Sequence, residues 1–345
     1  MPLLTLLVTV RDATCAVVLG AALVLAAPAA AAAAVGAGTA TREPPRLDDL
    51  RWLGTHNSYH LRPERPLLPN EPTDYAHAPL DVQLSDQGVR SLELDAWNAP
   101  ELPVFHQLVV DTASTCPNLE TCFRTIDAWS DKHPKHEPLV ILVEAKPVPV
   151  STNATVQTVI NNATTDLGIT NWNAAAFDRL DALVRKSFGR SLITPDDVRG
   201  TRRTLREAVV HNGWPTVTKG RGKVLAVLIG EQAELDLYRA EAPLLEGKGM
   251  FASSEPTDPS AAVILRDVPD AASRIDELVR QHFIVRTRAD AEEGEARTND
   301  HTRADAALAS GAQIVATDYP APDPAVGPYV VALPSPSREP GALNK

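Results

Sequence analysis

Acidic side chains stand at the ends of two short apolar segments. Glu93 and Asp95 are two residues apart at the end of the run 91–94, so on a strand both point to the same face. Glu144 follows the apolar run 139–143. If the three meet, protons or a cation must neutralise them, because like charges about 4 Å apart repel by roughly 4 kcal/mol at an effective dielectric of 20.

Asn57 adds an amide oxygen to these three acids. The result is an all-oxygen set, which hard cations such as Ca²⁺ or Mg²⁺ prefer. A solvated charge at a strand end is the ordinary alternative for any one acid. Only their convergence favours a metal site.

Two histidines border the acidic set, His56 directly before Asn57 and His106 after the run 104–105. Histidine has an unperturbed pKa of about 6.5, which allows proton transfer near neutral pH. One can serve a nucleophile and the other a leaving group. A packed core histidine is the alternative for His106.

Short apolar runs and longer amphipathic stretches must position these residues. Apolar residues recur at helical spacing in 119–129, 176–188, 271–283 and 304–309. Strand followed by helix, repeated, predicts an α/β fold with a single TIM-like (β/α)8 barrel, regular or irregular, with long active-site loops. The rival, a doubly wound sheet, usually carries a Gly-rich loop that is absent here. The eight strand candidates are 52–54, 91–94, 104–105, 139–143, 224–229, 263–265, 283–285 and 313–316.

Two connections, 57–86 and 148–175, are longer than strand–helix joints need, which predicts active-site or substrate loops. From residue 320 onward the chain is rich in proline, which predicts an extended strap or a disordered end. The predicted domains are a signal peptide over 1–40, a barrel over 41–320 and a Pro-rich tail over 321–345.

The N-terminal forty residues have an apolar run followed by small residues, which indicates a secretory signal peptide cleaved near Ala40 and a secreted protein. Arg11 is balanced by Asp12, so an uncleaved membrane anchor is the alternative. The net charge of -11 gives no electrostatic reason to bind nucleic acid or anionic membranes. Any contact with a membrane surface is therefore predicted to be transient.

The two cysteines outside the leader, Cys116 and Cys122, lie six residues apart. In an exported protein this pattern predicts a disulfide, with two free thiols as the alternative.

Four segments resemble the catalytic X region of phosphoinositide-specific phospholipase C, most of all its bacterial calcium-dependent branch. They are Gly54-Thr55-His56-Asn57-Ser58-Tyr59, Glu93-Leu94-Asp95-Ala96-Trp97, Val104-Phe105-His106 and Leu142-Val143-Glu144. The closing stretch 313–320 also looks like the end of this barrel, so the resemblance spans about residues 48–320. The chain departs from the eukaryotic members at Gln107-Leu108, where they have Gly-His.

The resemblance implies a phosphodiesterase that cleaves phosphatidylinositol to diacylglycerol and a (cyclic) inositol phosphate. It implies that His56 and His106 act on the phosphate, His106 as the acid for the leaving group. One Ca²⁺ per active site is held by the residues that match the family's ligands, Asn57, Glu93, Asp95 and Glu144. The partner is a phospholipid, with no obligate protein partner.

Further substrate contacts are expected at the mouth of the barrel, where charged residues follow three strand candidates: Lys146, Arg286, Arg288 and Asp318. Solvated charges are the alternative there.

Two other functions remain open. A glycerophosphodiester phosphodiesterase uses a similar barrel, although its first strand usually ends in His-Arg-Gly, whereas this chain has His56-Asn57-Ser58. A non-catalytic secreted barrel that binds calcium or lipid headgroups is the alternative from another class.

Overall fold

The computed structural model describes residues 43–63, 73–291, 294–333 and 342–343 of the chain. The predicted signal peptide over 1–40 lies outside these residues. The described residues belong to one compact unit that begins at Glu43. No helix among them is long and apolar enough to cross a bilayer.

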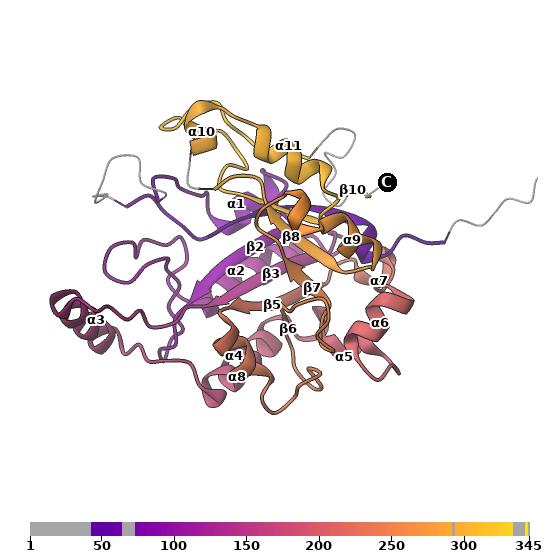
Figure 1. The fold of residues 1–345 in the computed structure, drawn as a ribbon, viewed down its shortest axis with the longest axis horizontal. Coiled ribbons are helices and arrows are strands. Elements are labelled where there is room, and N and C mark those ends of the chain that lie inside the picture. Colours follow the sequence, from indigo (N-terminus) through magenta and orange to yellow (C-terminus); the bar gives the residue numbers. More distant parts are fainter. Residues whose placement is uncertain (1–42, 64–72, 292–293, 334–341, 344–345) are drawn as a thin grey trace, which may run out of the picture. The chain divides into compact units, whose positions relative to one another are not determined.

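Parallel strands form an irregular TIM-like barrel, as predicted (Figure 1). Neighbours pair in the order β1, β2, β3, β5, β6, β7, β8, β9 and back to β1. Between β6 and β7 the ring is closed by a single parallel bridge, that of Ser253 with Val263. These strands are β1 (Leu50–Thr55), β2 (Ser91–Ala96), β3 (Leu139–Ala145), β5 (Val224–Gly230), β6 (Phe251–Ala252), β7 (Val263–Leu265), β8 (Ile284–Arg288) and β9 (Ile314–Thr317).

Two short strands lie outside this ring. β4 (Leu192–Ile193) pairs with the beginning of β5, on the edge that β6 continues. β10 (Ala342–Leu343) pairs antiparallel with β1.

Helices surround the barrel strands, and the strands are accordingly apolar along most of their length (Figure 1). Every residue of β5 except Gly230 is buried. Gly54 allows close packing at the end of β1, because a Cβ there would lie 3.2 Å from Ile314 and 3.2 Å from Ser91. The α-helices are α1 (Leu80–Ser85), α2 (Leu119–Lys132), α3 (Ala154–Leu167), α4 (Ala174–Phe188), α5 (Pro195–Arg199), α6 (Leu205–Asn212), α7 (Val217–Gly220), α8 (Gln232–Arg239), α9 (Ile275–Arg280), α10 (Gly294–Thr298) and α11 (Thr302–Ala309); the 3-10 helices are η1 (Leu47–Asp49), η2 (Gly189–Ser191) and η3 (Ala271–Ser273).

The strand predicted at 104–105 is wrong. Val104 makes one antiparallel bridge with Ala96, and Pro103 makes another with Asn118. The run is short and follows a proline, which has no N–H to donate to a ladder. His106 therefore lies on a loop between β2 and α2 rather than at a strand end, and the missing barrel strand is β6.

The connection 148–175 is long, as predicted, and α3 occupies half of it. Ile160 is the one residue of α3 that the structure describes as buried. A helix without an apolar stripe leaves little periodic signal in the sequence. The other connection, 57–86, contains α1, and residues 64–72 within it lie outside the described part.

The described part of the tail forms a strap. Tyr329 and Val331 are buried, and the Val331 N–H donates to the Tyr319 carbonyl oxygen over 3.0 Å. The Tyr329 ring stacks on His301 at 4.6 Å. Residues 334–341 of the predicted tail lie outside the description.

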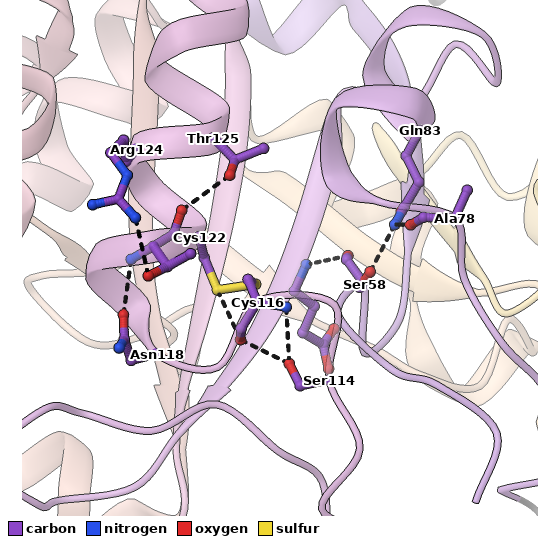
Figure 2. Close-up of a disulfide and its surroundings, with 11 residues drawn as sticks. Ser58, Ala78, Gln83, Ser114, Cys116, Asn118, Cys122, Arg124 and Thr125 are labelled. Atoms are coloured by element: carbon purple, nitrogen blue, oxygen red, sulfur yellow. Dashed lines mark hydrogen bonds between the residues drawn. A yellow bond between two sulfur atoms is a disulfide. The ribbon is translucent and has the colours of Figure 1, made fainter. Parts of the chain in front are cut away.

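Cys116 and Cys122 form the predicted disulfide (Figure 2). It joins the loop after His106 to the first turns of α2, whose N-terminus is capped by the Asn118 side chain. The same view shows Gln83 of α1, which donates to the Ser58 carbonyl oxygen over 2.6 Å and so supports the loop that follows His56.

Candidate active site

Two cavities open at the C-terminal ends of the barrel strands. The first, of about 410 Å³, is lined by residues from the ends of β1, β2, β3, β5, β6, β7 and β8, including His56, Glu93, Ser253, Arg286 and Arg288. The second, of about 490 Å³, is lined by His106, Lys146 and apolar residues of the β2–α2 loop and α3. Glu144 and Glu231 line both cavities.

The structure brings the three predicted acidic ligands together. Glu93, Asp95 and Glu144 each offer a carboxylate oxygen within 4.8 Å of the others. Asp95 and Glu144 are directly opposite one another on β2 and β3. Asp95 is 0% exposed, and the Lys146 ammonium lies 3.2 Å from its Oδ2. Burial raises the pKa of Asp95, and the neighbouring Glu144 raises it further.

Asn57 lies at the same end of the barrel in an unusual backbone conformation. Its φ of 46° is left-handed, and its side chain is buried. The Tyr59 hydroxyl, whose pKa is raised by burial and by Asp95, donates to Asn57 Oδ1 over 3.5 Å. Three converging carboxylates, together with a nearby amide oxygen, fit the preference of Ca²⁺ for oxygen ligands.

Protein cations already lie against the acids. Lys146 Nζ is 3.2 Å from an oxygen of Asp95 and 3.2 Å from an oxygen of Glu144. Burial lowers the pKa of Lys146, but the two carboxylates raise it by more, so it lies above its usual value. Arg286 donates to Glu93 over 2.6 Å. The predicted phosphate contacts Lys146 and Arg286 are thus bound to the acidic set in this structure.

His56 forms a dyad with Asp318. The distance between His56 Nδ1 and Asp318 Oδ1 is 2.9 Å, and His56 Nε2 is 3.8 Å from Glu93 Oε1. The other Asp318 oxygen accepts from Arg288 over 2.9 Å. Burial raises the pKa of Asp318, but His56 and Arg288 lower it by more, so it lies well below its usual range. Both Asp318 oxygens are engaged, so this residue holds His56 and Arg288 in place.

His106 forms a second dyad, with Asp111. His106 Nδ1 is 2.9 Å from Asp111 Oδ2, and His60 Nε2 is 2.9 Å from the same oxygen. A tight turn brings Asp111 back to His106, because Gln107 and Asp111 exchange two backbone hydrogen bonds. Burial lowers the pKa of His106, whereas Asp111 raises it. The two hydrogen bonds to histidines lower the pKa of Asp111 despite its burial.

The sequence did not identify Asp111 or Asp290, nor did it show that His60 is buried beside Asp111. Asp290 accepts from the Asp318 N–H over 2.9 Å, and burial and the Asp318 charge raise its pKa to about 7. Asp111 is five residues from His106 in the sequence, which is a weak signal, since no fixed spacing marks such a pair. Asp290 left no signal because it reaches the site from a loop after β8.

A parallel barrel whose mouth gathers three carboxylates and two His–Asp dyads is an arrangement suited to a metal-assisted phosphodiesterase. The sequence model of the family "Phosphoinositide phospholipase C, Ca2+-dependent" matches residues 96–339. The chain belongs to this family of phosphodiesterases. The matched region begins after Asp95, so it includes His106 and Glu144 but not His56, Asn57 or Glu93.

Solved structures share the fold. A calcium-dependent phosphoinositol-specific phospholipase C from Pseudomonas sp, in an apo form, is 20% identical, with 79% of this chain and 90% of that chain covered and a TM-score of 0.54. A Ca²⁺-dependent phosphatidylinositol-specific phospholipase C from Streptomyces antibioticus is 20% identical, with 80% and 95% covered and a TM-score of 0.55. No curated protein matches this sequence.

Proposed function

We propose that this chain is exported and cleaves phosphatidylinositol to diacylglycerol and a (cyclic) inositol phosphate, with one bound calcium ion. The observation that carries the proposal is the convergence of Glu93, Asp95 and Glu144, which each offer a carboxylate oxygen within 4.8 Å of the others. These three residues and Asn57 would hold the ion. When bound, calcium supplies positive charge that lowers the pKa of the inositol 2-hydroxyl and stabilises charge on the phosphate.

His56 acts at the phosphate. Asp318 engages Nδ1, so Nε2 is the atom that donates to a phosphoryl oxygen as negative charge develops. The proton of the attacking 2-hydroxyl is taken by Glu93, Glu144 or His56, all of which line the first cavity. Arg286 and Arg288 line the same cavity and give it the positive charge that a phosphate or an inositol ring would meet.

His106 serves the leaving group. Asp111 engages Nδ1 and keeps the ring in one orientation, so Nε2 protonates the departing diacylglycerol oxygen. His106 lines the second cavity, whose walls are mainly apolar. This location supports its assignment to the lipid side of the scissile bond.

The rim of the second cavity contacts the membrane in this proposal. Exposed valines line it from the β2–α2 loop and from α3: Val109 (50% exposed), Val110 (41%), Val156 (47%) and Val159 (45%). Exposed apolar patches of this kind mark protein or membrane contacts. The acidic net charge of -11 keeps this contact transient.

The test is headgroup release from phosphatidylinositol vesicles with and without a chelator. Turnover should be abolished by removing free Ca²⁺ and restored by about 10⁻⁴ to 10⁻³ M Ca²⁺, the range of many extracellular sites. Full activity in excess chelator contradicts the metal role. Faster hydrolysis of glycerophosphoinositol than of phosphatidylinositol would favour a glycerophosphodiesterase instead. N-terminal sequencing of the protein from culture medium tests export and cleavage near Ala40.

A further inference from the structure

Lys146 reaches the acidic set from a fixed point of the backbone. Its N–H donates to the Ala96 carbonyl oxygen over 2.9 Å, and its own carbonyl oxygen accepts from Trp172 over 3.1 Å. The ammonium lies 3.2 Å from both Asp95 Oδ2 and Glu144 Oε1. Since Asp95 and Glu144 are direct cross-strand partners, the Lys146 charge offsets part of the repulsion between them.

Lys146 and Arg286 differ in their freedom to move. The Arg286 side chain is 3% exposed and is bound to both Glu93 and Asp267. The Lys146 side chain is 18% exposed and lines the second cavity, of about 490 Å³. A lysine ammonium sits on a flexible four-carbon stem, so it can move into this cavity.

Calcium and Lys146 would compete for the same two carboxylates, Asp95 and Glu144. An ion bound by Asp95 Oδ2 and Glu144 Oε1 would repel an ammonium that stays beside both. We infer that Lys146 is the resident cation of the calcium site: it pairs with Asp95 and Glu144 in the metal-free protein and moves toward the second cavity when calcium binds. Lys146 thereby weakens calcium binding and sets the concentration at which the protein becomes loaded. This inference rests on the proposed calcium site.

The first experiment is isothermal titration of chelator-treated protein with Ca²⁺. Lys146→Met keeps most of the stem and removes the charge, so calcium should bind about 5- to 150-fold more tightly, the usual range for coupling between two binding events. Lys186→Met is the matched control, because Lys186 pairs with Glu120 over 3.0 Å at an exposed surface. It should bind calcium like the wild type. Unchanged or weaker binding by Lys146→Met contradicts the inference.

The second experiment uses the wild-type protein and so does not depend on the folding of a variant. Crystals grown in chelator and in Ca²⁺ should differ at Lys146, whose Nζ should leave Asp95 and Glu144 by more than the salt-bridge limit of about 4 Å. An ammonium that stays beside Asp95 with calcium bound overturns the inference. The wild type could bind calcium and cleave lipid while Lys146→Met does not bind calcium more tightly or Lys146 does not move. In that case this inference alone is wrong. If the wild type binds no calcium, the proposed metal site fails with it.

Discussion

The two cavities that share Glu144 and Glu231 differ in the side chains around them. Charged residues such as Arg266, Asp267 and Arg288 line the cavity that holds His56. Valines of the β2–α2 loop and of α3, and prolines of the segment between β3 and α3, line much of the cavity that holds His106. A phospholipid has the same two parts, a polar headgroup and an apolar glycerolipid. The comparison suggests that each histidine serves the part of the substrate that its own cavity suits.

The largest expected effect separates the two histidines. His106→Ala should lose about 10² to 10⁴ in rate with phosphatidylinositol, the usual contribution of a general acid. It should be partly rescued by a nitrophenyl inositol phosphate, because nitrophenolate leaves without a proton. His56→Ala should be damaged equally with both substrates, since phosphate charge develops in either reaction. Selective rescue of His56→Ala, measured by steady-state rates, would reverse the assignment.

The next effect concerns Asp111, whose hydrogen bond positions the His106 ring. Asp111→Asn should lower the rate on lipid by about 10²-fold, the lower end of what a general acid contributes. A general acid must be protonated, so activity should fall as pH rises through the pKa of His106, which burial places below its usual value. Asp111 raises that pKa, so the variant's fall should move to lower pH. A lower rate with an unmoved pH profile would indicate a purely structural role.

The disulfide anchors the loop that carries His106 and Asp111. The double variant Cys116→Ser with Cys122→Ser should lose about 2 kcal/mol of unfolding free energy, since the loop between the cysteines is short. Its activity on lipid should fall more than its binding of calcium, because the ligands lie on the barrel strands and the loop after β1. Denaturant unfolding measures the loss of stability, and lipid hydrolysis and calcium titration measure the two functional losses. Equal losses of lipid activity and of calcium binding would contradict this prediction.

The smallest effect tests the apolar rim. Val156→Asp should lower activity on phosphatidylinositol vesicles about fivefold, because a half-exposed valine can contribute roughly 1 kcal/mol on burial. Its activity on a soluble nitrophenyl substrate should stay unchanged. Leu237→Asp is the control, since Leu237 is 39% exposed on α8. Equal loss in both variants would show that added negative charge, and not the rim, is responsible.

The acidic set was predictable because its members lie on strands. Glu93 and Asp95 share a face by the alternation of a β-strand, and Glu144 ends the neighbouring strand. The closure of the barrel at β6 could not be predicted, because a strand of two residues gives no periodic pattern. The loop position of His106 was also missed, since a two-residue apolar run beside Pro103 looks like a strand until its partners are known.

The barrel class, the acidic set, the two histidines and the cysteine pair were predictable from sequence, because strand alternation and short motifs are local properties of a chain. The pairing of each carboxylate with its histidine, and of each cation with its acid, depended on the three-dimensional fold. Asp318 is 262 residues from His56, and Arg286 is 193 residues from Glu93. Such pairs form because closing the barrel brings distant strand ends together, and no local pattern records that distance.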